Sequence, residues 1–240
     1  MPSGRLRGMS ELLDGCEGIP GFLAAWYGPP DLPAGPTVPG AGRLPRALRE
    51  WYEITSRYAR PVLFNCKVFP VDEACEYDGV IGFCMDDFEY QEFGFAPSDE
   101  DPPVLCRMVG GGEPWEPMAE GLTLSKFLHV LLAWESVEGA RHAASADELT
   151  LDQLKVLLAP LRLLPGPKEV PTLYVGEGLL AHTWPNLEAE GRWHLRLAAR
   201  TDGLLGYAEA VPGVTFGPGE WWPDPLAPEY SDPVDDGVSA

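Results

Sequence analysis

The sequence predicts an α+β fold in which an antiparallel or mixed β-sheet meander packs against several α-helices. Two observations carry this prediction. Apolar residues recur with helical spacing over 44–58 and 124–135, whereas 77–108 and 173–210 hold short apolar runs separated by turn signals. Because the apolar stripe of a helix has to be buried against another element, we expect the helices to cover one face of the sheet.

Four segments have the pattern of helices bounded by proline, glycine or a capping residue: 20–27, 44–58, 124–135 and 151–159. Thr123 and Thr150 stand at the N-cap positions of the last two. His129 lies off the apolar stripe of its helix, so we expect it on the surface. Residues 137–146 have no strong pattern and are expected to form a linker.

The meander over 77–108 is the most informative stretch. Residues 80–85 are almost wholly apolar, and two aspartates at 86 and 87 follow them as a turn signal. The alternation of aromatic residues then changes phase, which predicts a β-bulge near 91–94. A third strand is expected over 104–108, and Pro102-Pro103 sets its start or an edge position.

The C-terminal part has the period of strands. Short strands are predicted over 173–175, 179–184, 193–199 and 204–210, and residues 161–164 are expected to form a buried turn. We expect these strands to lie beside the first meander or to extend it, giving one domain over 19–222; a separate subdomain over 168–216 is the alternative. Residues 1–18 are expected to be flexible, and 223–240 to be a disordered, acidic, proline-rich tail.

The charge of the chain restricts its partners. The 240 residues hold 37 acids and 17 Lys or Arg residues, a formal net charge of −20. This balance disfavours nucleic acid and anionic membranes and favours a basic partner, although acidity for solubility is an equal alternative. No apolar run approaches the ~20 residues of a membrane span. The five cysteines lack the spacing of a zinc site, so we expect reduced thiols in a cytoplasmic protein, with no metal or cofactor.

The sequence contains none of the common local motifs of an enzyme: no nucleophile elbow, zincin helix, phosphate loop or dinucleotide fingerprint. Its notable feature is a run of eleven acids without Lys or Arg over 72–101. Two of these carboxylates could act as general acid and base of a hydrolase, but a hairpin turn exposes side chains that such a mechanism needs in a pocket. A docking face for a basic partner and an ordinary solvated face are the other interpretations.

An ordered series of short motifs resembles the SUKH superfamily. The series consists of Phe64-Asn65, Pro70, Asp78-Gly79, Gly82-Phe83, Asp86-Asp87, Phe93-Gly94, Asp101-Pro102-Pro103-Val104, Trp115 and Leu124-Ser125-Lys126-Phe127-Leu128. The resemblance covers residues 19–137. We expect the amide of Asn65 to bond local backbone in an irregular turn rather than to contact a partner.

The resemblance implies a non-enzymatic immunity protein that binds a basic toxin domain, such as a nuclease, and blocks it. The residues assigned to this contact are Asp86, Asp87, Glu89, Tyr90, Glu92, Asp99, Glu100, Asp101 and Trp115. Tyr90 would be an aromatic anchor, and Trp115 is expected either to anchor a partner or to pack in the core. The alternative functions are a regulatory scaffold protein of the same superfamily and a carboxylate-based hydrolase.

Overall fold

The computed structural model describes residues 18–35, 42, 44–86, 90–97, 100–110, 112–164, 166 and 172–218. The predicted tail over 223–240 lies outside the described residues, as does the predicted N-terminal segment up to residue 17. Three of the residues assigned to partner binding, Asp87, Glu89 and Asp99, also lie outside them.

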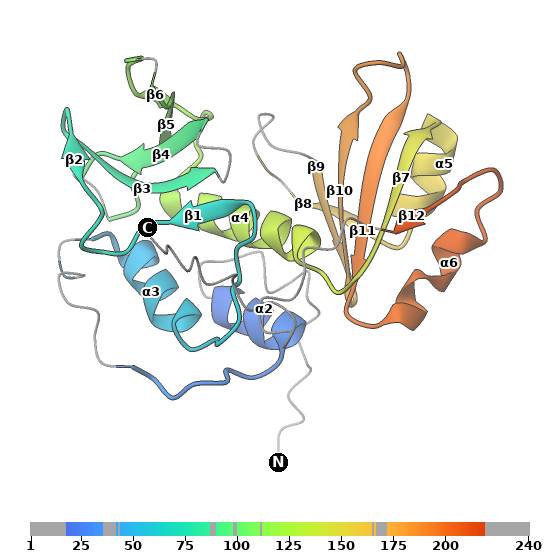
Figure 1. The fold of residues 1–240 in the computed structure, drawn as a ribbon, viewed down its shortest axis with the longest axis horizontal. Coiled ribbons are helices and arrows are strands. Elements are labelled where there is room, and N and C mark those ends of the chain that lie inside the picture. Colours follow the sequence, from blue (N-terminus) through green and yellow to red (C-terminus); the bar gives the residue numbers. More distant parts are fainter. Residues whose placement is uncertain are drawn as a thin grey trace, which may run out of the picture.

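The fold is α+β, as predicted, and its strands form two antiparallel sheets (Figure 1). The first sheet has the order β1-β3-β4-β5-β6, with β2 also paired to β3, and the second has the order β12-β7-β11-β10-β9-β8. The strands of the first sheet are β1 (Cys66–Val68), β2 (Glu76–Tyr77), β3 (Val80–Asp86), β4 (Gln91–Phe95), β5 (Leu105–Met108) and β6 (Glu116–Pro117). Those of the second are β7 (His142–Leu149), β8 (Arg162–Leu164), β9 (Thr172–Gly176), β10 (Leu179–Pro185), β11 (Trp193–Ala199) and β12 (Gly217–Pro218).

Helix α4 (Leu124–Glu138) joins the two sheets. Figure 1 shows it beneath the first sheet, with its C-terminal end directed at the second. It packs against α2 (Gly18–Tyr27), α3 (Arg46–Thr55) and strands β9, β10 and β11. Because other elements cover it on several sides, nearly every residue of α4 is buried, and residues on both sides of its predicted stripe lie in the core.

The hydrophobic core has two parts, one on each face of the second sheet. The larger part surrounds α4 and takes side chains from both sheets, among them Phe83 and Phe93 from the first and Leu180 from the second. The smaller part lies between the opposite face of the second sheet and helices α5 (Leu151–Leu158), η2 (Asp202–Leu205) and α6 (Gly206–Glu209). Within the described residues, the C-terminal strands thus form a sheet of their own, and α4 packs between this sheet and the first one.

The first two predicted helices are present with different ends. Helix α2 begins at Gly18 rather than Pro20, because Ile19 is already buried and a proline in the first turn needs no N–H bond. Helix α3 begins after Pro45, whose backbone is extended, and ends at Thr55. Tyr58 then leaves the helix, and its hydroxyl donates to the carbonyl oxygen of Gly28 at 3.2 Å.

The predicted bulge lies on the neighbouring strand. Strand β4 is regular from Gln91, and the pairing register slips between Gly82 and Cys84 of β3. The extra residue is therefore Phe83, which turns inward with Phe93 to contact Phe127 of α4, at ring-centroid distances of 5.9 and 5.1 Å.

Three predictions for the C-terminal half give the wrong kind of structure. Residues 204–210 form η2 and α6 instead of a strand, because Leu205 and Ala208, three residues apart, are the side chains buried against the sheet. Residues 137–146 are no linker: α4 continues to Glu138, and β7 begins at His142. The predicted buried turn over 161–164 contains strand β8, which pairs with β9.

Candidate functional site

The first sheet carries most of the unbalanced charge. From Cys66 to Thr123 the sequence has fourteen acids but only two bases, Lys67 and Arg107. Both bases are already paired, Lys67 with Glu73 at 3.8 Å and Arg107 with Glu92 at 2.6 Å. Nine further acids of this segment are described, and none of them forms an ion pair within the described residues: Asp72, Glu76, Asp78, Asp86, Glu100, Asp101, Glu113, Glu116 and Glu120.

Some of the assigned residues hold the chain's own backbone. The Oδ1 atom of Asp86 accepts from the backbone N–H groups of Tyr90 and Gln91 at 2.7 and 3.1 Å, so this carboxylate holds the backbone at the start of β4. Asp101 accepts from the N–H and the hydroxyl of Ser125 at 2.8 and 2.6 Å. It therefore caps α4, whereas Thr123, the predicted cap, makes no capping bond.

Glu92 and Trp115 belong to a platform on the outer face of the first sheet, which we define as Tyr77, Glu92, Arg107 and Trp115. The guanidinium of Arg107 bonds Glu92 through two nitrogens and lies 4.4 Å from the ring of Trp115 and 5.6 Å from that of Tyr77. The face is glycine-lined: a Cβ atom on Gly82 would overlap Glu92, and one on Gly94 would come 3.0 Å from the Trp115 ring. Trp115 is thus half-buried on the outer face.

Exposed apolar side chains lie at one end of this sheet, beside the β3–β4 turn. Tyr90 is 64% exposed, and Met108 and Val109 are also exposed. The three are neighbours because Gln91 pairs with Met108 and the N–H of Val109 donates to the carbonyl oxygen of Tyr90. Tyr90 is therefore in a position to contact a partner, next to the paired Glu92.

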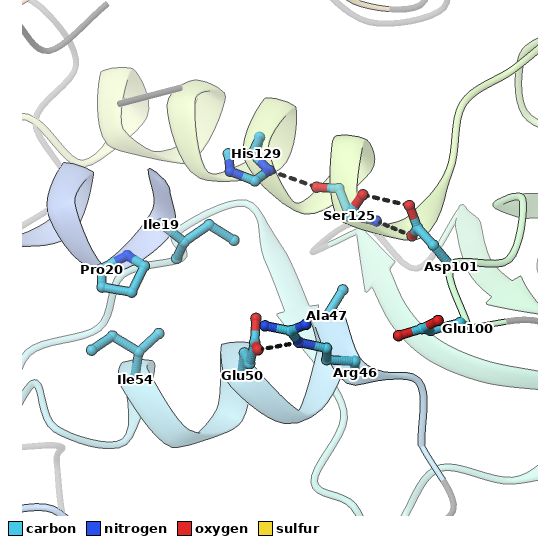
Figure 2. Close-up of a pocket in the computed structure, with 10 residues that line it drawn as sticks. All are labelled: Ile19, Pro20, Arg46, Ala47, Glu50, Ile54, Glu100, Asp101, Ser125 and His129. Atoms are coloured by element: carbon cyan, nitrogen blue, oxygen red, sulfur yellow. Dashed lines mark hydrogen bonds and ion pairs between the residues drawn. The ribbon is translucent and has the colours of Figure 1, made fainter. Parts of the chain in front are cut away.

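Glu100 and Asp101 line a pocket that sequence patterns did not predict (Figure 2). The pocket has a volume of about 280 Å³ and lies between α2, α3 and α4. Its polar side chains are those of Arg46, Glu50, Glu100, Asp101, Ser125 and His129, and its apolar ones are Ile19, Pro20, Ala47 and Ile54. The residues come from four separate segments, so no local spacing could have indicated it.

His129 is buried in this wall of the pocket, which corrects its predicted surface position. Its side chain is 6% exposed, because α2 and α3 cover the flank of α4 on which it lies. The Nδ1 atom lies 2.7 Å from the carbonyl oxygen of Ser125, one turn earlier, while Nε2 is buried without a hydrogen-bond partner in the described structure.

A second charged cluster joins the C-terminal end of α4 to the second sheet. Glu138 contacts His182 at 2.7 Å and Arg196 at 3.2 Å. Burial opposes ionisation of Glu138, but the hydrogen bond and charge of His182 and the charge of Arg196 outweigh it and lower the pKa of Glu138. The side chain of Asn65 lies close enough to Glu138 to help lower the pKa of that carboxyl group.

Glu135, one turn earlier in α4, is fully buried. Its Oε2 atom accepts from the backbone N–H groups of Phe64 and Asn65, and its Oε1 atom has no partner in the described structure. Burial raises the pKa of Glu135 from 4.5 to about 7, although the two N–H bonds act in the opposite direction. No sequence pattern distinguishes Glu135 from the other glutamates of the predicted helices, so its burial could not be predicted.

Comparison with family models, curated proteins and solved structures finds no match to this chain. Within the described residues, no group of three His, Cys, Asp or Glu side chains is arranged to hold a metal ion. None of the described helices has the length and apolar character needed to cross a bilayer.

Proposed function

We propose that this chain is a non-enzymatic immunity protein, which acts in the bacterial cytoplasm by binding a basic toxin domain and blocking it. The observation that carries the proposal is the excess of unpaired acids on the first sheet, whose two bases are both neutralised within the chain. The SUKH-like motif series lies largely on the same sheet and on α4, which supports the same function.

A nuclease is the class of toxin that this surface fits best. Nucleases must hold phosphate groups, so their substrate surfaces are basic. An acidic protein bound to such a surface excludes the nucleic acid, because both compete for the same Lys and Arg side chains. Complementary charge also speeds association, which favours rapid neutralisation.

The contact surface is best placed on the platform and the exposed acids beside it. Tyr77 and Trp115 reach Arg107 from opposite edges of the sheet, since β2 pairs with β3 and β6 pairs with β5. The acids next to them in sequence, Glu76, Asp78, Glu113 and Glu116, are exposed and flank the platform on both edges. Asp86, Glu92 and Asp101 bond the chain itself, so their larger role is to hold the surface in shape.

Affinity capture from lysate of the native host tests this proposal. The bait is compared with two variants that lose four negative charges each: one replaces Glu76, Asp78, Glu113 and Glu116 with their amides, and the control replaces Glu177, Glu188, Glu190 and Glu209 with Gln. We expect the parent and the control to retain a basic protein in a 1:1 complex, and the first variant to lose most of it. Equal capture by both variants would place the contact elsewhere, and turnover of a captured protein or small molecule would contradict a purely binding role.

A further inference from the structure

The pocket between α2, α3 and α4 has a marked imbalance of charge (Figure 2). It contains three carboxylates, those of Glu50, Glu100 and Asp101, against the one guanidinium of Arg46. Arg46 is already bound to Glu50, its Nε atom lying 2.6 Å from Oε1. Glu100 has no hydrogen bond or ion pair within the described residues. The pocket therefore favours an occupant with positive charge.

The hydrogen-bonding groups of the pocket point to the same chemistry. A carbonyl oxygen can only accept, so the Nδ1 atom of His129, 2.7 Å from the oxygen of Ser125, has to be the donor. In the neutral imidazole this leaves Nε2 as an acceptor, and it is buried without a donor. The carboxylates are also acceptors. An occupant that offers several N–H groups and no acceptor would satisfy this set, and a guanidinium group has five N–H donors and no acceptor.

The size and lining of the pocket suit a single side chain. Cavities for drug-sized ligands hold roughly 300–1,000 Å³, and this one holds about 280 Å³. Ile19, Pro20, Ala47 and Ile54 provide an apolar wall for the aliphatic stem of a long side chain, whose charged end can then meet the carboxylates.

We propose that this pocket receives an arginine side chain of the basic partner. The inference rests on the proposed function, because it takes the occupant from the toxin domain. It adds a specific anchor away from the platform, on the α4 side of the first sheet: the arginine stem lies against α2 and α3, and the guanidinium contacts Glu100, which Figure 2 shows at the opposite end of the pocket from His129. Such buried arginine anchors are typical of binding hot spots.

The test uses N-acetyl-arginine amide as the probe and N-acetyl-citrulline amide as its uncharged match. Binding to the full chain is followed by NMR titration of the backbone N–H groups of Ala47 and Ser125. We expect saturable, millimolar binding of the arginine probe and at least tenfold weaker binding of the citrulline probe. Glu100→Gln should weaken binding of the arginine probe about threefold, as for one exposed charge pair, whereas Glu188→Gln, in the connection between β10 and β11, should leave this binding unchanged.

A second variant excludes a purely electrostatic effect. Ala47→Leu fills the pocket without changing its charge and should abolish saturable binding. Equal binding of both probes, or undiminished binding to Ala47→Leu, would overturn the inference. The proposed function fails separately: if a basic partner is captured and binds Glu100→Gln and Ala47→Leu as it binds the parent, the pocket is not the anchor but the immunity role stands. If the arginine probe binds and no basic partner is captured, the pocket recognises arginine but the immunity role fails.

Discussion

At the scale of single residues, the buried carboxylate of Glu135 has the clearest consequence for stability. Its pKa is raised to about 7 in the folded chain, so the native state holds this proton over a pH range in which the unfolded chain has lost it. The sign follows from the direction of the shift: a carboxyl group with a raised pKa favours folding at low pH and opposes it once it ionises. Stability should therefore fall as the pH rises from 4.5 to 7.

Glu135→Gln should remove this dependence. The amide keeps an oxygen that can accept from the N–H groups of Phe64 and Asn65, but it cannot ionise. Since one unit of pKa corresponds to about 1.4 kcal/mol, the free energy of unfolding of the variant should gain about 3 kcal/mol on the parent between pH 4.5 and 8. Urea unfolding at a series of pH values measures this gain. The exposed Glu120→Gln serves as control, and parallel curves for parent and Glu135→Gln would show that Glu135 ionises normally in the folded chain.

At the scale of elements, both ends of α4 are set by residues outside the helix. Asp101 caps its beginning from the preceding loop. At its end, Gly139 lies against Phe64, and a Cβ atom there would overlap the aromatic ring. These contacts fix where the helix starts and stops, and they tie it to the first sheet and to the segment before β1.

The cap predicts a difference between two substitutions. Asp101→Ala removes both bonds to Ser125 and should lower the free energy of unfolding by about 1 kcal/mol, the usual cost of a lost N-cap. Thr123→Ala, at the position that the sequence pattern favours, should cost less. Chemical denaturation of the two variants decides between them, and a larger loss for Thr123→Ala would mean that the pattern had identified the true cap.

At the C-terminal end of α4, we expect the stability effects of substitutions at Gly139 and Phe64 to be coupled. Gly139→Ala should destabilise the chain by about 1–3 kcal/mol, because the added methyl group displaces the Phe64 ring. In the background of Phe64→Ala the same substitution should cost far less, so a double-mutant cycle should give a clear coupling energy. Gly206→Ala, where a Cβ atom meets nothing within 4 Å, is the matched control. Additive effects at 139 and 64 would contradict the overlap.

Periodicity predicted helices α2 to α5 and six of the twelve described strands (β3, β4, β5, β9, β10 and β11), but it did not predict which neighbours would cover them. The cap predicted at Thr150 was confirmed, and Gln153 completes a capping box with it that was not predicted. The error at His129 has a physical origin. Other elements cover α4 on several sides, so even residues outside its apolar stripe are shielded from solvent. The error over 204–210 arose because Asp202-Gly203 suggests a turn between two strands, whereas the buried residues that follow it, Leu205 and Ala208, are three apart and fit a helix. The pocket was beyond prediction, since it depends on packing between distant segments.

At the scale of the whole molecule, the two sheets differ in charge and in the core that they help to form. The first sheet holds the acids and the platform, and α4 connects it to a second sheet with its own core on the far face. The proposed role of the first sheet depends on long-range attraction, which salt screens over a Debye length of ~8 Å at physiological ionic strength. Association should therefore be faster at low salt, and the exposed acids rather than the backbone-bound ones should control it.

The most direct test of this account is the association rate of the purified complex as a function of ionic strength. The captured partner is mixed with the parent chain, with the variant lacking the charges of Glu76, Asp78, Glu113 and Glu116, and with the second-sheet control of equal net charge. The account predicts that the parent and the control associate quickly with a steep salt dependence, and that the first-sheet variant associates several-fold more slowly with a flatter one. Identical rates for all three chains at low and high salt would contradict it.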